Sequence, residues 1–583
     1  MLKNKPVILD LRYKGCLDPK YSKLFNKTAN ENRKIFTKLI ERLSRGNEYN
    51  LDWWASGPAS RNIYTSPLFH YCCSLVFIEK LIESGESFNE IQTDSKALSN
   101  ILEVELHDRD DISVVCTSNS FLRLKNIIYA VYYIISTPIY FLSNHIAALF
   151  TKGLSKPIPN NPLTLIDTFV VQLNYNDRYY PGLWDALTEL EKKTVYFVPT
   201  LLQQKLISIN TYKFLRKSDV NYLLKEDYLC IHDYWYAWKY WIRVLKIKVK
   251  KTSLSGYDIA PLVREELIRF DGYFSAFLAI LNYSFVKRLK VNGIELRLVI
   301  DWFENQVIDK GLNAGLNKYY PNLKNKGYQG FVISKHHLCL YPTDLEQKLG
   351  LIPDEILVIG QGLINQVKEF CPNNNNVYVS VAPAFRFKSV WDKRQQYPGK
   401  SKFTVLISLS IVLDETKRIM NVLSELLEKN EIDGIRFRLK IHPATPTNKI
   451  MKLLSNKLYH RLKIVEGDFN YFLEEANLVI TSGSSTLSLN AIVKGVPAII
   501  VTGTNGLIHN PVPPIVNNKM WKLCFNAEEV FQAINYYQYK GFDSDVENIE
   551  IGKTIRSQFF ESVTRKGVLK LLDIEEYNEI QAN

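Results

Sequence analysis

Short apolar runs alternate with segments of helical period along most of the chain, and the alternation is clearest after residue 400. Between two such runs, apolar residues recur at the 3.6-residue period from Ile419 to Leu427, which predicts a helix with one buried stripe. Strands are expected at residues 403–411, 435–441, 462–465, 478–481 and 498–501. Buried strands separated by helices are typical of a parallel sheet with crossover helices, so the pattern predicts an α/β fold.

The N-terminal half shows the same rhythm with longer interruptions. Its strands are expected at residues 7–11, 90–93, 112–116, 163–171, 195–199, 296–302, 355–360 and 377–383. Two Rossmann-like sheets, one in each half, are the simplest interpretation. The chain then divides into an N-terminal domain of residues 1–355, a C-terminal domain of residues 356–540, and a tail, residues 541–583, that is a candidate to pack back on the first domain.

The composition is that of a globular protein, with 46% hydrophobic and 23% charged residues among 583. It excludes a disordered chain, a collagen-like fibre and a polytopic membrane protein. The 73 Lys and Arg residues outnumber the 60 Asp and Glu residues, which gives a net charge of +13. An anionic partner is therefore expected: a nucleotide, a lipid surface or an anionic glycan. The chain has no helix-turn-helix, zinc-finger or RNA-binding signature, so nucleic acid is not an expected partner.

The cysteines and the N-terminus favour the cytoplasm. The eight cysteines form no CxxC pair and no zinc-type spacing, which is typical of reduced, mostly buried thiols. The first apolar run, residues 7–11, is too short for the core of a signal peptide.

One insertion, residues 120–152, contains a long stretch without charge. Residues 126–150 have no Asp, Glu, Lys or Arg, and about 20 apolar residues suffice for a helix to cross a bilayer. Basic residues flank the stretch on both sides, so the positive-inside rule gives no direction, and Pro138 favours a break. The favoured interpretation is a kinked segment lying in one leaflet; a buried pair of core helices and a full span are the alternatives.

A second insertion, residues 234–253, joins an aromatic run to a basic run. Aromatic rings suit the headgroup boundary and lysines suit anionic lipid. The alternative is a solvated basic helix that covers the protein's own core. The candidate membrane residues are Trp235, Trp238, Trp241, Lys246, Lys248, Lys250 and Lys251. Together the two insertions predict a protein attached peripherally to the inner face of the cytoplasmic membrane, with an anionic lipid surface as a partner.

Candidate chemistry is concentrated at two strand ends of the C-terminal domain. The strand at 435–441 ends at His442-Pro443, and the strand at 478–481 ends in a Ser/Gly-rich turn before a helix. Ligands of open α/β sheets bind outside the carboxyl ends of strands, and such a turn offers N–H groups and hydroxyls to a phosphate. The turn alone is equally typical of a helix N-cap, but the ordered pair, followed by Gly495-Val496-Pro497, predicts a phosphate site. Its residues are His442, Pro443, Ser482, Gly483, Ser484, Ser485 and Thr486.

This combination resembles the donor domain of GT-B glycosyltransferases, most closely the bacterial sialyl-, polysialyl- and Kdo-transferases that use CMP-activated sugars and have HP and SS/ST motifs. His442-Pro443 matches the first motif and Ser484-Ser485-Thr486 the second. The resemblance implies a GT-B fold with a cleft between two domains, a histidine and hydroxyls that hold the phosphate of the leaving nucleotide, and a carboxylate base from the N-terminal domain. Many nucleotide-diphosphate-sugar enzymes have an acidic residue where this chain has Asn490, which favours a CMP donor.

The middle of the chain resembles a group of large bacterial surface-carbohydrate biosynthesis proteins. The matching stretches are residues 177–183, 302–306, 327–331 and 382–386. This resemblance implies O-antigen, capsule or related glycan assembly, often with eight- or nine-carbon acidic sugars.

The general base is expected at a strand end that faces the cleft. The candidates, in order, are Glu304, Asp177 and Asp301. Burial beside Trp302 and Phe303 would raise the pKa of such a carboxyl group towards a useful value. The alternatives are an ion pair between Asp177 and Arg178 and a helix N-cap at Asp301. The candidates to bind the donor phosphate or a sugar carboxylate are Arg386 and Lys417.

No metal or resident cofactor is expected. Asp108-Arg109-Asp110 and Asp543-Ser544-Asp545 have the DxD form of metal-dependent glycosyltransferases but follow no clear strand end. The adjacent His336 and His337 would point to opposite faces of a strand.

The sequence therefore predicts a metal-independent GT-B enzyme that moves a sugar from a nucleotide sugar onto a cell-surface glycan or lipid-linked acceptor. The favoured donor is a CMP-activated acidic sugar such as Kdo or a nonulosonic acid. The alternatives are a CDP-glycerol-type glycerophosphotransferase, another nucleotide-sugar GT-B enzyme, and a non-enzymatic membrane scaffold of glycan assembly.

Overall fold

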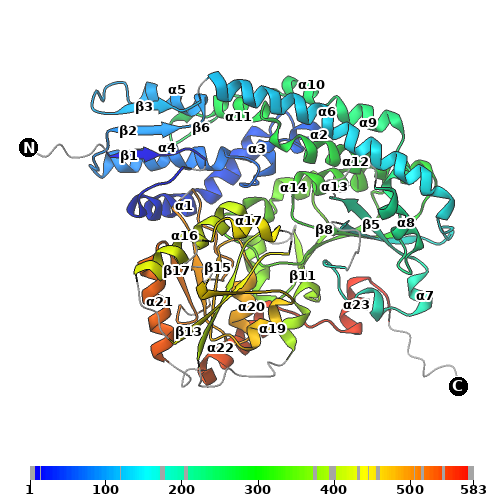
Figure 1. Ribbon diagram of the computed structural model, residues 1–583. Helices are drawn as coiled ribbons and strands as arrows, with labels where there is room; N and C mark the ends of the chain where they lie inside the picture. The colour runs from blue at the N-terminus through cyan, green and yellow to red at the C-terminus, as the bar shows by residue number, and fades with distance from the viewer. Residues whose placement is uncertain are drawn as a thin grey trace, which may run out of the picture.

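The protein is built on three parallel β-sheets, two large and one small (Figure 1). The computed structural model describes residues 7–13, 15–118, 120–170, 177–202, 208–371, 377–392, 402–429, 434–443, 445–454, 460–504, 506–513, 516, 518–540 and 545–575. The α/β class and the two Rossmann-like parallel sheets are confirmed. The small third sheet is an addition that the sequence pattern did not predict.

The small sheet contains the first three strands of the chain, β1 (Ile8–Asp10), β2 (Glu90–Thr93) and β3 (Ser113–Cys116), in that order. α1 (Pro19–Leu43) and α4 (Leu68–Glu83) pack on each other beside it. These strands were expected in the large N-terminal sheet, and that expectation is wrong. An apolar run predicts a strand but does not specify its partner, and these strands pair with one another.

The middle sheet has the order β11-β10-β9-β8-β4-β5 and is parallel throughout. Its strands are β4 (Leu163–Val170), β5 (Val195–Leu201), β8 (Leu296–Trp302), β9 (Lys324–Gln329), β10 (Glu355–Val358) and β11 (Tyr378–Val381). β10 pairs with β9 from its first residue, Glu355. The expected domain boundary between residues 355 and 356 therefore falls inside this sheet and is wrong: the next sheet begins only at Phe403.

The C-terminal sheet has the order β14-β13-β12-β15-β16-β17, again parallel. Its strands are β12 (Phe403–Ser408), β13 (Ile435–Lys440), β14 (Leu462–Val465), β15 (Leu478–Ser482), β16 (Ala498–Val501) and β17 (Trp521–Cys524). The first five match the predicted strands. For the central strands β12, β15 and β16 the reason is that strands buried on both faces appear as continuous apolar runs. The predicted amphipathic helix is α16 (Leu413–Lys429), which buries Ile419, Leu423 and Leu426 completely.

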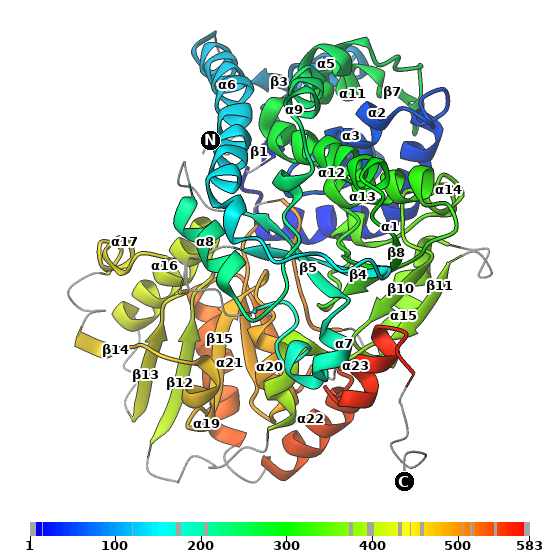
Figure 2. The same ribbon diagram turned by 90° about the vertical axis from the view of Figure 1, so that its right-hand side faces the viewer.

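The C-terminal segment returns to the middle sheet. α22 (Asp545–Phe559) lies below the C-terminal sheet, and α23 (Arg565–Leu571) lies below the middle sheet (Figures 1 and 2). The backbone of Glu561 donates to Ile359 at 2.6 Å and accepts from Ala384 at 2.9 Å. Lys326 of β9 forms an ion pair with Asp573 at 2.6 Å. The segment therefore connects the two large domains.

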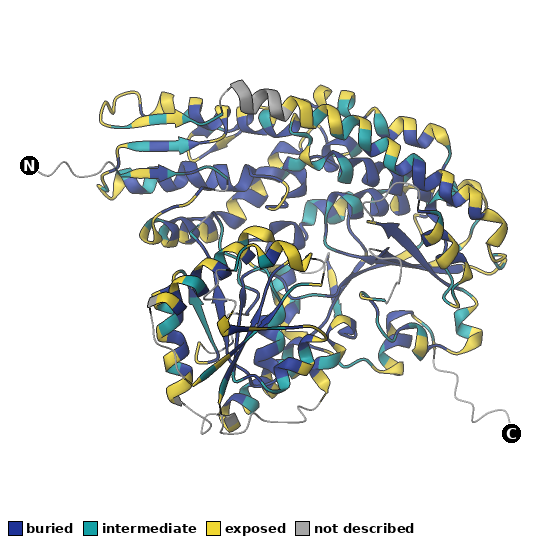
Figure 3. Ribbon diagram, in the orientation of Figure 1, coloured by how far each residue is buried: buried dark blue, intermediate teal, exposed yellow. Residues whose placement is uncertain are grey.

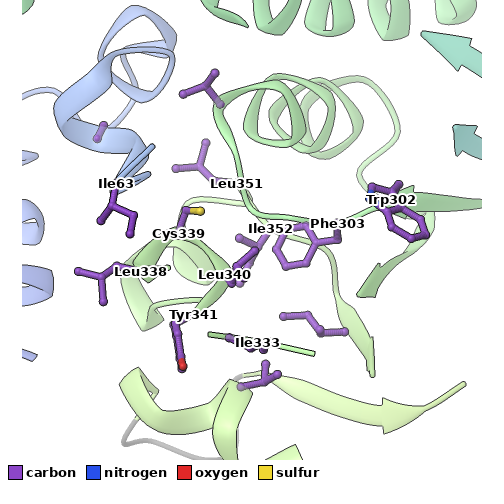
Figure 4. Packing of buried hydrophobic residues seen from close by; sticks show 14 of the residues in the cluster. Ile63, Trp302, Phe303, Ile333, Leu338, Cys339, Leu340, Tyr341, Leu351 and Ile352 are labelled. Atoms are coloured by element: carbon purple, nitrogen blue, oxygen red, sulfur yellow. The ribbon is translucent and has the colours of Figure 1, made fainter. Parts of the chain in front are cut away.

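One apolar core joins the small sheet to the middle sheet. Ile63, from the connection between β1 and β2, belongs to the same cluster as Leu338 and Phe303 (Figure 4). A buried ion pair crosses the same contact, from Arg61 to Glu346 at 2.7 Å, with each side chain 2% exposed. The small sheet is thus fixed on the middle sheet.

The charge-free stretch forms a single helix, α6 (Ser120–Thr151), which remains helical across Pro138. It runs along the outside of the N-terminal half and shows exposed positions along much of its length (Figure 3). The segment 127–154 is long and apolar enough to span a membrane, and 17% of its most apolar window is buried. The alternative of a buried core helix pair is therefore wrong. The expected break at Pro138 is also wrong, because α6 continues through this residue.

Candidate active site

The C-terminal sheet changes direction between β12 and β15. From β12 the chain adds β13 and β14 on one side, and β15 then lies on the other side. Loops at the carboxyl ends of two such strands run in opposite directions and leave a crevice, where ligands of open α/β sheets bind. Ser410 follows β12, and Ser484 follows β15.

Side chains of these two loops meet at the crevice. Ser484 Oγ lies 3.2 Å from Ser410 Oγ and donates to Glu415 Oε2 at 2.5 Å. Glu415 lies in the first turn of α16. Ser484, Ser485 and Thr486 are half-buried, so their hydroxyls border the crevice, whereas Ser482 is fully buried and is not available to a donor as expected.

Gly483 allows the turn after β15 to pass close to another loop. A Cβ at this position would lie 2.2 Å from the backbone oxygen of His509. The His509 ring stacks on Tyr64 with ring centroids 5.0 Å apart, and Tyr64 contacts His337 edge-on at 5.0 Å. The turn after β15 therefore packs on a loop whose His509 contacts side chains of the N-terminal half.

His442 follows β13 and is half-buried, and Pro443 beside it is exposed. Burial lowers the pKa of His442 below its ordinary value, and the charges of Arg178 and Lys440 lower it further. The imidazole is therefore neutral at pH 7. Arg178 belongs to the N-terminal half and is close enough to His442 for its charge to lower this pKa.

The middle sheet has its own switch point, between β4 and β8. The chain after β4 leads to Tyr179, and the chain after β8 leads to Glu304. The Tyr179 and Trp302 rings meet edge-on with centroids 4.6 Å apart. Burial raises the pKa of Tyr179, and its environment includes the charges of Arg386 and Glu304. The carboxyl edges of the two large sheets lie in the same region, because His336, after β9, donates to the Ile508 carbonyl, after β16.

Glu304 is held in a fixed orientation at this edge. Its Oε1 accepts from the Trp302 indole N–H at 2.9 Å, and its Oε2 accepts from the Gln306 amide at 2.5 Å. The side chain is half-buried, so it remains within reach of a bound hydroxyl. The next residue, Asn305, has a left-handed backbone with φ of 50° and donates to Glu346. Such a conformation in a non-glycine residue persists only where the surroundings impose it, which fixes the direction of Glu304.

The other two carboxylate candidates, Asp177 and Asp301, accept hydrogen bonds from neighbouring groups of the protein. Asp177 Oδ1 accepts from the backbone N–H groups of Tyr179 and Tyr180, both at 2.9 Å, and so shapes the loop. Asp301 is fully buried and accepts from Asn313 at 2.8 Å. Burial, followed by the charge of Asp167, raises the pKa of Asp301 to about 8. We expected burial beside Trp302 and Phe303 to raise the pKa of a carboxyl group, and this holds for Asp301. Because Asp301 is fully buried, however, it cannot reach the hydroxyl of an external acceptor.

The two basic candidates, Arg386 and Lys417, lie in different parts of the structure. Arg386 is exposed, and its guanidinium lies 5.7 Å from the Trp302 ring centroid and 5.9 Å from that of Tyr179. Lys417 instead pairs with Asp414 at 3.8 Å on the exposed side of α16. Its neighbour Arg418 packs on Gly503, in the loop after β16, where a Cβ would lie 2.1 Å from the guanidinium carbon. Arg418, not Lys417, lies at the carboxyl edge of the sheet.

Sequence reasoning missed three residues of this site and assigned no role to a fourth. Those missed are Ser410, Glu415 and Arg418, and the fourth is Arg178. A signal was present for Ser410, because it follows β12 as Ser484 follows β15. Among the described residues, no group of three or more His, Cys, Asp or Glu side chains is arranged to hold a metal ion.

No family model and no curated protein matches the chain. Among solved structures, the chain is similar to a UDP complex of MnaA from S. aureus, with a TM-score of 0.40, 11% identity, and coverage of 71% of this chain and 98% of that one. It is also similar to MurG of Acinetobacter baumannii (TM-score 0.37, 11% identity, 71% and 99% covered). A third is UDP-GlcNAc 2-epimerase from Neisseria meningitidis bound to UDP-GlcNAc (TM-score 0.41, 12% identity, 70% and 99% covered). Similarities this distant are not evidence for the activity of this chain.

Proposed function

We propose that the protein is a GT-B glycosyltransferase that transfers a sugar from a nucleotide sugar without a metal. The observation that carries the proposal is the meeting of two switch points. Arg178, after β4, acts electrostatically on His442, after β13, while Glu304 lies at the carboxyl end of β8. A donor phosphate held on one side and an acceptor hydroxyl on the other would meet between them.

In the proposed reaction, Glu304 removes the proton from the acceptor hydroxyl. The acceptor oxygen forms a bond to the anomeric carbon, and the bond from that carbon to the donor phosphate oxygen breaks. The electron pair remains on the leaving phosphate, whose negative charge the N–H of His442 and the hydroxyls of Ser484, Ser485 and Thr486 stabilise. The neutral imidazole required for such a donor is consistent with the lowered pKa of His442.

The donor we propose is a CMP-activated acidic sugar, and the acceptor a cell-surface glycan or a lipid-linked glycan. Two features support an acidic sugar: the exposed guanidinium groups of Arg178 and Arg386 border the site, and Asn490 in α20 (Leu487–Val493) adds no negative charge there. A planar guanidinium binds a carboxylate through two parallel hydrogen bonds.

The test is nucleotide release from a donor panel. The purified protein is incubated with CMP-sugars, UDP-sugars and CDP-glycerol, and release of CMP or UDP is followed with and without acceptor glycans. Release of CMP from a CMP-sugar, with no nucleotide released from the UDP-sugars or from CDP-glycerol, supports the proposal. CMP release from CDP-glycerol would identify a glycerophosphotransferase, and nucleotide binding without turnover would identify a scaffold; either result overturns it.

A further inference from the structure

The outer face of α6 presents an unusual amount of apolar surface. Ten large apolar side chains of this helix are between 47% and 76% exposed. They are Ile127, Ile128, Tyr129, Val131, Tyr132, Ile135, Ile139, Ile146, Leu149 and Phe150. Contiguous apolar patches above roughly 300–600 Å² are rare on soluble monomers and mark interaction sites.

The inner face of α6 is fixed to the protein. The Tyr140 hydroxyl donates to the Leu201 carbonyl at 2.8 Å, and the Arg216 guanidinium donates to the Ala148 carbonyl at 3.1 Å. Polar side chains on this side, among them Asn144, are buried. Both ends of the helix lead into strands of the folded body, β3 and β4. The helix therefore lies along the surface of the protein rather than leaving it as a span.

A second apolar patch continues this face. Trp238 of α9 (Ile231–Trp238) donates its indole N–H to the Ile134 carbonyl of α6 at 3.1 Å. Trp235 stacks on Trp238 at 4.7 Å and is itself 51% exposed. Beyond it, α10 (Tyr240–Arg243) and the turn Val244–Lys246 expose Ile242 and Leu245. We call the exposed residues of α6, α9, α10 and this turn the α6–α10 surface.

The charged residues along these two segments are basic except for one paired aspartate. No Asp or Glu occurs between Asp111 and Asp167, where the charged residues are Arg123, Lys125, Lys152 and Lys156. Between Asp227 and Asp258 the sole acidic residue, Asp233, is paired with Arg288 at 2.8 Å. The basic residues there are Lys239, Arg243, Lys246, Lys248, Lys250 and Lys251, of which Arg243 is paired with Asp52. The acidic residues Asp108, Asp110 and Asp111 precede β3 and limit the basic segment.

We propose that the α6–α10 surface binds an anionic lipid bilayer, with α6 lying in the plane of the interface. Exposed aliphatic side chains enter the headgroup boundary, exposed Trp235 lies at that level with the Lys239 ammonium 4.9 Å from its ring, and the basic segments face anionic headgroups. A partner protein would not account for basic residues at both ends of a charge-free helix, whereas an anionic membrane accounts for both features.

This surface lies next to one side of the candidate active site. Ala147 and Ala148, on the inner face of α6, share an apolar cluster with Val170 and Leu201, which end β4 and β5. These are the carboxyl ends of the middle sheet, so the bilayer would lie beside the half of the site assigned to the acceptor. Membrane binding itself does not depend on the proposed reaction.

Co-sedimentation of the full-length protein with vesicles tests the proposal. The probes are vesicles of phosphatidylcholine alone and of phosphatidylcholine with phosphatidylglycerol. We expect binding to the mixed vesicles that weakens about fivefold for each of Lys246, Lys248, Lys250 and Lys251 changed to Gln, and that also falls at high salt. Changing Ile128, Tyr132 and Ile135 together to Gln should lower binding roughly tenfold or more, because each side chain is at least half exposed and none supports the core.

Matched controls lie elsewhere on the surface. Changing Tyr471, Tyr539 and Val546 to Gln removes exposed apolar groups, and changing Lys290, Lys449, Lys519 and Lys553 to Gln removes four charges. Neither set should alter vesicle binding. Failure of the wild-type protein to bind mixed vesicles, or equal losses in controls and test variants, overturns the proposal. Self-association in sedimentation velocity that the α6 variant abolishes would assign the face to a second copy of this chain and also overturns it.

Discussion

Ser484 Oγ and Ser410 Oγ lie 3.2 Å apart although 74 residues separate them in the chain. β12 and β15 are parallel neighbours in the sheet, so the residues that follow their carboxyl ends lie close together. Glu415 fixes Ser484 from a third segment at 2.5 Å. The single proton of the Ser484 hydroxyl therefore points at Glu415 before any ligand arrives, and the hydroxyl has to turn from Glu415 to donate to a phosphate.

Ser484→Ala should weaken nucleotide binding without unfolding the protein. The change removes one hydroxyl at the crevice and leaves Glu415 without that donor, so we expect the Kd for CMP to rise roughly three- to tenfold. Titration calorimetry with CMP measures it. Ser424→Ala is the matched control, because Ser424 lies on the exposed side of α16 and donates to Glu428. Equal affinities in the wild-type protein and both variants would remove Ser484 from the donor site.

His442→Ala should keep the fold and lose most of the turnover. A neutral imidazole that donates to the leaving phosphate is comparable to an oxyanion-hole donor, whose loss lowers the rate roughly 10²–10³-fold. The measurement is kcat at saturating donor, with a thermal melt to check folding. His107→Ala, at an exposed position outside the site, is the control and should turn over normally. A folded His442→Ala variant with full activity would contradict the role assigned to this residue.

Acid should loosen the contact between the two large domains. His336, after β9, is 4% exposed and donates through Nδ1 to the Ile508 carbonyl at 2.9 Å. Burial, and then the charge of His509, lowers its pKa to about 3 from an unfolded value near 6.5. Between these values the unfolded chain binds a proton that the folded protein excludes at His336, so the contribution of His336 to the free energy of unfolding falls as the pH drops below 6.5.

Thermal melts from pH 8 to pH 5 measure this dependence. His336→Gln keeps a donor for the Ile508 carbonyl but does not titrate, so its Tm should depend less on pH over this range. Buried carboxyl groups add a slope of opposite sign that both proteins share: the pKa of Asp301 is raised to about 8 and that of Glu266 to about 7, so their contributions to the free energy of unfolding increase as the pH falls through these values. The difference between the wild-type protein and the variant therefore isolates His336. Identical slopes for the wild-type protein and the variant would exclude His336 as the titrating group.

The sequence was sufficient to predict most of the strands, but it did not show which strands pair in the same sheet. β12, β15 and β16 were predictable because burial on both faces leaves continuous apolar runs. The separate small sheet and the assignment of β10 to the middle sheet were not, because strand pairing is a long-range property. His442 and Ser484 were found from their positions after strands, whereas Glu415 acquires a role only once β15 lies beside β12.

The carboxylate candidates are best compared as isosteric amides. Glu304→Gln keeps the side chain's size and one accepted hydrogen bond, from Trp302, and the Gln306 amide can rotate to accept from the new NH2 group. The variant cannot accept the proton of the acceptor hydroxyl, so turnover should fall roughly 10²–10⁴-fold. Donor affinity should change little, because the phosphate is held by the C-terminal domain.

Asp177→Asn and Asp301→Asn are the matched controls and should do less harm. Asparagine at 177 still accepts from the backbone of Tyr179 and Tyr180, so any loss should appear in the KM for acceptor. Asp301 has a pKa of about 8 and is already mostly protonated at pH 7, so an amide there mimics the native state. The three variants are compared by kcat at saturating acceptor. If Asp177→Asn is inactive while Glu304→Gln turns over normally, the base belongs to the loop after β4, and the hydrogen bonds from Trp302 and Gln306 serve only to shape the loop after β8.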